Sequence, residues 1–198
     1  MRRLSTRLVA ALGPCEREED LLPAVGAAIE KVRGRPVKLR AVAFPPETAS
    51  GVWIDHSGFD ILAFEQHTDP GHQLVILGHE TWHMFQGHCS SLTAHGTVAA
   101  RAQDTPRADA LTTLLARLTA TDTDTEPGSG SGEPAPPRMH IAMRTGSGAD
   151  QHEEDAEFFG VRFATSVQAA VAASRAVADT AQLAGRIEVS MAHRRRRT

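Results

Sequence analysis

The stretch DPGHQLVILGHETWHMFQG, residues 69–87, decides the fold of this chain. Asp69 is a typical N-cap residue, and Pro70 suits the first helical position because proline there loses no helical hydrogen bond. Gly87 is typical of the residue that ends a helix. Apolar side chains fill the centre of the stretch, so we predict a buried helix from Pro70 through residue 85, about four and a half turns long.

The second half of this predicted helix carries His79-Glu80-Thr81-Trp82-His83. Residues four apart on a helix share a face, so His79 and His83 can offer two imidazoles to one ion, and Glu80 reaches the edge of the same site. Such a short motif also arises by chance, but burying these side chains without partners would be costly. We interpret His79 and His83 as Zn²⁺ ligands and Glu80 as the base that takes a proton from water.

Catalytic zinc typically has three protein ligands, so a third must come from elsewhere. A histidine three residues after a glycine, as in HExxHxxGxxH, is disfavoured because Gln86 and Cys89 occupy those two positions. The other common source is a carboxylate on a later helix. The segment QHEEDAEFFG, residues 151–160, supplies four acids in five positions.

Helical geometry separates these acids. At about 100° per residue, Glu153 projects with a face of small and apolar residues, whereas Asp155 projects to the opposite side. We predict Glu153 as the third ligand and Glu157, one turn later, as acceptor of a hydrogen bond from a ligating histidine. Glu154 and Asp155 are better explained as acids that favour a helix N-terminus. A shift of one residue in the helix would make a neighbouring acid or His152 the ligand.

The pair formed by HETWH at 79–83 and EEDAEFFG at 153–160 resembles the ImmA/IrrE family of zinc metallopeptidases, whose second motif reads roughly Glu-x-x-Ala-Asn/Asp-x-Phe-Ala. Glu157 here replaces the usual Asn or Asp, and Gly160 replaces the usual Ala. The resemblance covers about residues 20–165. It implies a cytoplasmic zinc metalloendopeptidase acting on a protein substrate, and family members encoded beside helix-turn-helix regulators point to such a regulator.

The rest of the chain predicts an α+β fold. Apolar residues spaced by three and four indicate a helix over 17–32, and a second over 108–120. Residues 150–184 predict one long helix or two consecutive ones. Between the first helix and the HExxH helix lie three β-type runs, with a hairpin joining the last two, at 37–44, 51–55 and 59–64. Together with the resemblance, this predicts a zincin-like domain: a small antiparallel sheet packed against the HExxH helix, and a later helix that gives the third ligand.

Length and composition favour one domain over residues 1–198, with a core at about 17–184, a flexible loop at 121–137 and a basic tail at 194–197. The net charge of -3 gives no general reason to expect nucleic-acid or membrane binding, and four arginines at the tail are too few to change this. The two cysteines are far apart in sequence, which favours reduced thiols in the cytoplasm.

Two hypotheses from different classes follow. The first is a zinc-dependent metalloendopeptidase, and the alternative is a noncatalytic regulatory or toxin-component protein that keeps the scaffold to bind a partner protein. The presence of Glu80 favours the enzyme. Hydrolysis also benefits from a donor that stabilises the oxyanion, and the sequence has no tyrosine. The candidate donors are histidines among which the sequence does not choose: His88, His95, His140 and His152.

Overall fold

The computed structural model describes residues 1–15, 17–56, 58–87, 90–91, 105–120, 138–143 and 151–195. These residues form an α+β fold, and the loop expected at 121–137 lies outside them, as do positions 196 and 197 of the basic tail. In chain order the elements are α1 (Arg2–Ala11), the 3-10 helix η1 (Glu18–Asp20), α2 (Leu21–Arg33), β1 (Val37–Val42), β2 (Ala49–Asp55), β3 (Asp60–Glu65), α3 (Pro70–Gln86), β4 (Ser90–Ser91), α5 (Thr105–Ala120), β5 (Arg138–Met143) and α6 (Gln151–Arg195).

The strands form one sheet in the order β1-β3-β2-β5-β4. The β2–β3 hairpin is antiparallel, as predicted, but β1 pairs with β3 in parallel, so the prediction of an antiparallel sheet is wrong and the sheet is mixed. The reason lies in residues 43–48, where Pro45-Pro46 prevents a tight hairpin between β1 and β2. Neighbouring strands are about 4.8 Å apart, and this longer connection leaves room for β3 between them.

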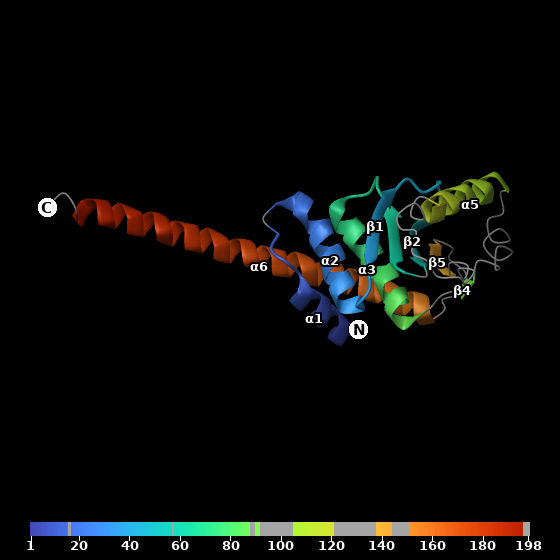
Figure 1. Ribbon diagram of the computed structural model, residues 1–198, viewed down its shortest axis with the longest axis horizontal. Helices are drawn as coiled ribbons and strands as arrows, with labels where there is room; N and C mark the ends of the chain where they lie inside the picture. Colours follow the sequence, from blue (N-terminus) through green and yellow to red (C-terminus); the bar gives the residue numbers. More distant parts are fainter. Residues whose placement is uncertain are drawn as a thin grey trace, which may run out of the picture.

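Both faces of the sheet are covered, because alternate residues of its strands join different cores. Trp53 and Leu62 pack with α1, α2, α3 and α6 on one face, whereas Ile54 and Ile61 pack against leucines of α5 on the other. Figure 1 shows α5 on the far side of the sheet from α3 and α6. The helix predicted at 108–120 is therefore the cover of the second face, and the sheet forms the middle of three layers.

Helix α3 has the boundaries that its sequence predicts. The backbone N–H of His72 donates to Asp69 Oδ1 at 3.0 Å, so Asp69 is the N-cap, and Pro70 is the first helical residue. Gly87 ends the helix in the left-handed conformation, with φ of 71°. This conformation is easy only for a residue without a Cβ atom.

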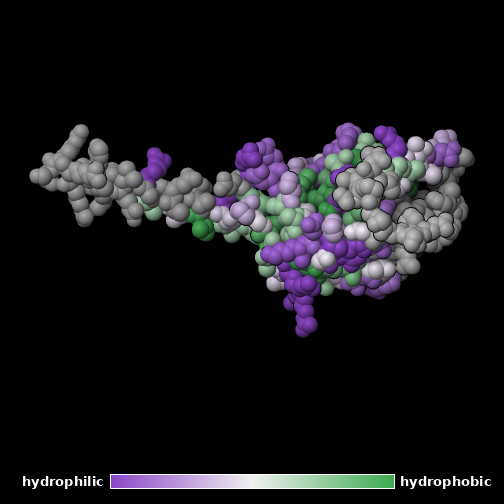
Figure 2. Space-filling view, viewed as in Figure 1, coloured by the Kyte–Doolittle hydropathy of each residue, from purple (hydrophilic) through white to green (hydrophobic). Residues whose placement is uncertain are grey.

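Helix α6 is one continuous helix of 45 residues. Its first half packs against α3 and α1, with buried side chains as far as Val171. Beyond that residue it projects from the body of the molecule (Figure 1). Val177 and Leu183 on the projecting part are 70% and 57% exposed, and Figure 2 shows a few hydrophobic residues along it. Within the described ranges, no helix combines the length and the apolar character needed to cross a membrane.

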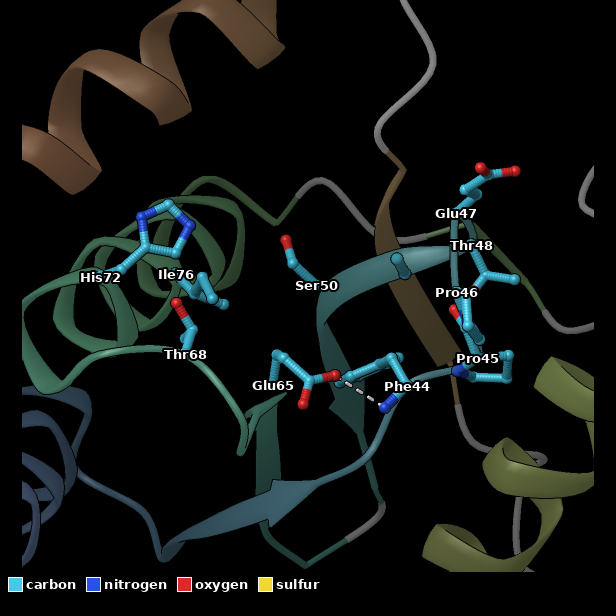
Figure 3. A pocket seen from close by; sticks show the side chains of 11 residues that line it. Phe44, Pro45, Pro46, Glu47, Thr48, Ser50, Glu65, Thr68, His72 and Ile76 are labelled. Carbon is cyan, nitrogen blue, oxygen red and sulfur yellow. Dashed lines mark hydrogen bonds between the residues drawn. The ribbon is translucent and has the colours of Figure 1, made fainter.

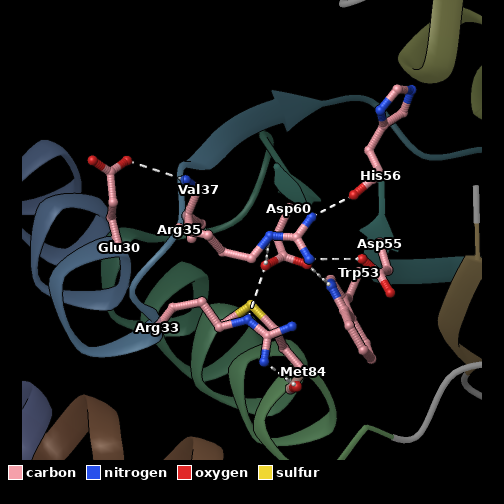
Figure 4. Close-up of polar contacts among 9 residues, drawn as sticks. All are labelled: Glu30, Arg33, Arg35, Val37, Trp53, Asp55, His56, Asp60 and Met84. Atoms are coloured by element: carbon pink, nitrogen blue, oxygen red, sulfur yellow. Dashed lines mark hydrogen bonds and ion pairs between the residues drawn. The ribbon is translucent and has the colours of Figure 1, made fainter. Parts of the chain in front are cut away.

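A buried carboxylate ties the last turn of α3 to the sheet (Figure 4). Asp60 is completely buried, and it accepts hydrogen bonds of 2.9 Å from Trp53 Nε1 and from Arg33 Nε. Arg33 also donates from Nη1 to the carbonyl oxygen of Met84 at 3.3 Å, and Arg35 Nε lies 3.4 Å from Asp60. Since a buried charge is costly without partners, this network holds α2, β3 and the end of α3 in one arrangement.

Candidate metal centre

Helices α3 and α6 cross at two glycines, and their backbones touch there. A Cβ atom on Gly78 would lie 2.9 Å from the Cα of Gly160, and a Cβ on Gly160 would lie 2.6 Å from the carbonyl oxygen of Val75. Neither position has room for a side chain, so glycine is required by close approach rather than by a special backbone angle. Beside this crossing, the rings of Trp82 and Phe159 pack with centroids 5.1 Å apart.

This crossing brings the first turn of α6 against the second half of α3, where three side chains meet. The Nε2 atoms of His79 and His83 are 3.1 Å apart. Glu153 Oε2 lies 3.3 Å from His79 Nε2, and Glu153 Oε1 lies 3.5 Å from His83 Nε2. These three residues, which we call the His-His-Glu trio, form a group that can hold a metal ion.

The two histidine nitrogens of the trio are spaced as around a small tetrahedral ion. When ligand bonds are about 2.0–2.1 Å long and meet at the tetrahedral angle, two ligand atoms lie about 3.3 Å apart. The two histidine nitrogens are 3.1 Å apart, and each lies 3.3 or 3.5 Å from a different oxygen of Glu153. With one ligand atom taken from each residue, the three atoms lie within 4.8 Å of one another. Two imidazole nitrogens and one carboxylate are also a donor set used by catalytic zinc.

The trio is closed on one side and open on the other. The His83 side chain is completely buried, the His79 side chain is 13% exposed, and that of Glu153 is 41% exposed. Solvent therefore reaches the group from the side of Glu153. A metal held there would have a route for water or for a substrate to a fourth ligand position.

Glu80 lies next to the trio on the side of the sheet and is completely buried. Strand β2 passes so close that a Cβ atom on Gly51 would lie 2.8 Å from Glu80 Oε1 and 2.7 Å from Ile76 Cγ2. The missing side chain at position 51 is what leaves space for the Glu80 carboxylate between α3 and β2. The base predicted from the motif is thus held in one place by the packing of the strand.

Burial along α6 follows the face on which Glu153 is predicted to lie. The residues predicted to share its face, namely Ala156, Gly160, Ala164 and Val167, are all buried, whereas Glu154 is exposed. Glu157 is exposed as well, so its role as an orienting acceptor stays a prediction without support from burial. His152, the alternative ligand, is exposed beside Glu153 and does not belong to the trio.

Among the residues that the structure describes, the trio includes none of the other candidate histidines. His88 and His95 lie outside the described residues, as does Cys89. His140 lies in β5, in register opposite Trp53. Cys15 is a buried free thiol whose pKa is raised by burial, so it stays protonated near neutral pH and offers no thiolate to a metal.

The sequence did not predict two features of the site, which are strand β5 and the close approach of backbones at Gly51 and Gly78. Strand β5 covers the side of β2 away from β3, so that β2 is an interior strand at the site. Its sequence RMHIAM alternates in hydropathy, and this period could have revealed it. The close approach could have been predicted from Gly51 and Gly78, because glycine inside a strand or helix often marks a place where two backbones lie close together.

No family model, curated protein or solved structure matches the chain. The chemistry of the trio and of Glu80 is therefore the basis for assigning a function.

Proposed function

We propose that this chain is a zinc-dependent metallopeptidase of the ImmA/IrrE type. The observation that carries the proposal is the His-His-Glu trio, whose ligand atoms lie within 4.8 Å of one another, beside a completely buried Glu80. Two imidazoles, one carboxylate and an adjacent second carboxylate are the parts that hydrolysis by a zinc enzyme requires.

In this proposal His79, His83 and Glu153 hold the ion. Bound zinc would polarise the substrate carbonyl and lower the pKa of a coordinated water to about 7. Glu80 accepts the proton of the attacking water and delivers it to the amine nitrogen of the leaving peptide. Because β2 packs against its carboxylate, Glu80 does not have to be oriented during the reaction.

The donor set also separates zinc from other metals. Calcium and magnesium prefer six or more oxygen ligands, so a group with two imidazoles disfavours both. Iron(II) in oxygenases does use two histidines and one carboxylate. The buried Glu80 favours hydrolysis over oxygen chemistry, because only the hydrolytic reaction needs a proton acceptor at that place.

The substrate in this proposal is a protein, as the family resemblance suggests. The trio opens to solvent at Glu153, which gives a large substrate access to it. The family resemblance suggests a helix-turn-helix regulator in the cytoplasm. A noncatalytic protein that binds its partner with the same scaffold is the competing hypothesis. It gives no reason for a second carboxylate to be buried beside the trio.

Peptide hydrolysis by the purified chain tests this proposal directly. A mixed peptide library is incubated with the chain in ¹⁸O-labelled water, and new C-termini are detected by mass spectrometry. We expect labelled products, their loss after treatment with a chelator, and their return when zinc is added back. A His79→Ala variant is the matched control and should give none. A zinc-loaded, folded chain that cleaves no peptide would count against the enzyme.

A further inference from the structure

A pocket of about 160 Å³ lies beside the first half of α3 (Figure 3). It is formed by α3, by the segment that connects β1 to β2 and by the end of β3. Its volume is well below the roughly 300–1,000 Å³ of pockets that hold whole small molecules. The pocket therefore fits a single side chain. The residues that give it its character are apolar Phe44, Pro45 and Ile76, and polar Glu65, Thr68 and His72.

The pocket lies near Glu80 of the proposed catalytic site. Ile76, in its wall, lies one helical turn before Glu80, and a side chain on Gly51 would touch both of them. Ser50, which precedes Gly51, also lines the pocket. Four residues of helix correspond to about 6 Å along the axis. An extended peptide advances about 3.3 Å per residue, so the pocket is about two residues away from the reacting bond.

One wall of the pocket carries a fixed negative charge. Glu65 Oε2 accepts a hydrogen bond of 2.8 Å from the backbone N–H of Phe44, and Oε1 accepts one of 2.8 Å from that of His67. Burial acts to raise the pKa of Glu65, but these hydrogen bonds outweigh it and hold the pKa below its usual value. Figure 3 shows this carboxylate between Thr68 and Phe44. A carboxylate can accept about four hydrogen bonds. The two backbone N–H groups and His67 Nδ1, which lies 3.0 Å from Oε1, account for three of them, so one remains for a ligand.

The other charges near the pocket do not cancel this one. Glu47 also lines the pocket, and its carboxylate forms an ion pair with Arg107 at 2.5 Å. The positive charge of Arg107 therefore offsets that of Glu47. The described residues that line the pocket include no lysine or arginine. His67 contacts Glu65 through Nδ1 at 3.0 Å, and its own side chain is 70% exposed. The lining is therefore anionic, with apolar walls on either side of the charge.

We infer that this pocket binds a lysine or arginine side chain of the protein substrate, about two residues from the bond that is cut. The aliphatic stem of such a side chain packs against Phe44 and Ile76, and its cationic end meets Glu65. This inference rests on the proposed function, because it assigns the specificity of the same site.

The test compares the wild-type chain with Glu65→Gln, which removes the charge and keeps an oxygen for the backbone N–H of Phe44 but not for that of His67. Thermal unfolding of the variant therefore accompanies each measurement. Cleavage sites in a peptide library are mapped for both proteins. We expect the wild type to prefer lysine or arginine over glutamine or leucine at one position near the cut, by about ten-fold in kcat/KM, the size of one hydrogen bond to a charged group. Glu65→Gln should lose this preference through KM and cleave neutral peptides normally. Glu18→Gln, on an exposed residue of η1, is the control.

A second measurement does not depend on cleavage. A short blocked peptide with one lysine, and its counterpart with glutamine, are titrated into each protein and followed by NMR. Binding of the lysine peptide about ten-fold tighter to the wild type than to Glu65→Gln supports the pocket. Equal binding of both peptides, or an unchanged basic preference in folded Glu65→Gln, overturns it. Peptide cleavage without a basic preference refutes the pocket alone, whereas absence of any cleavage with intact lysine binding refutes the enzyme alone.

Discussion

Replacing Glu80 with glutamine is expected to lower peptide hydrolysis by roughly 100- to 10,000-fold, the contribution typical of a general base. Glutamine has nearly the same shape, so it should fit the space that Gly51 leaves beside α3. It cannot accept a proton from water. The trio itself is unchanged in this variant, so zinc content and thermal stability should stay near those of the wild type.

The measurement is kcat/KM on a peptide cleaved by the wild type, with zinc content and thermal unfolding recorded for the same samples. Glu154→Gln is the matched control, because Glu154 is exposed and does not belong to the trio. It should hydrolyse peptides at the wild-type rate. If Glu80→Gln cleaves as fast as the wild type, Glu80 is not the base. If the variant binds a partner protein as the wild type does, and neither cleaves it, the noncatalytic hypothesis is favoured.

The second large effect is expected from Gly160→Ala. The new methyl group would lie 2.6 Å from the carbonyl oxygen of Val75, which is backbone and cannot rotate away. Helices α3 and α6 must therefore move apart. Glu153, two turns earlier on α6, then moves away from His79 and His83. Alanine is favoured over glycine in a helix by about 1 kcal/mol, whereas overpacking costs about 1–3 kcal/mol, so we expect a net loss of stability.

Zinc affinity should fall by at least about ten-fold in Gly160→Ala, because displacing one of three ligands weakens a site even when the fold survives. A competition titration with a zinc chelator measures this, and chemical denaturation measures the stability. Gly26→Ala is the control on another helix, since its methyl group would meet only the flexible side chain of Leu39. Wild-type zinc affinity in Gly160→Ala would show that the close crossing does not position Glu153.

Local features of this chain were predictable from its sequence. The ends of α3 depend on Asp69, Pro70 and Gly87, which act on their own neighbours. The proximity of His79 and His83 follows from one turn of helix. Glu153 required only one further step, which was to find the face of α6 that small residues mark as buried.

Features that depend on distant parts of the chain were not predictable in the same way. The parallel pairing of β1 with β3 depends on which strand enters the space beside β1, and hydropathy does not encode this. Strand β5 pairs with β2 across a long separation in sequence. Glu157 lies beyond the edge of the buried face of α6. It lies four residues after Glu153, which places it only about 40° further round α6, and yet it is exposed.

Zinc content tests the central claim most directly. The chain is purified without chelator, and its metal is measured by mass spectrometry beside His79→Ala and Glu153→Ala variants. We expect about one zinc ion per wild-type chain and a large loss in both variants, because each removes one of three ligands. Undiminished zinc in Glu153→Ala would assign the third position to another residue. A folded wild-type chain that contains no zinc, and takes up none when it is added, would contradict the metal centre itself.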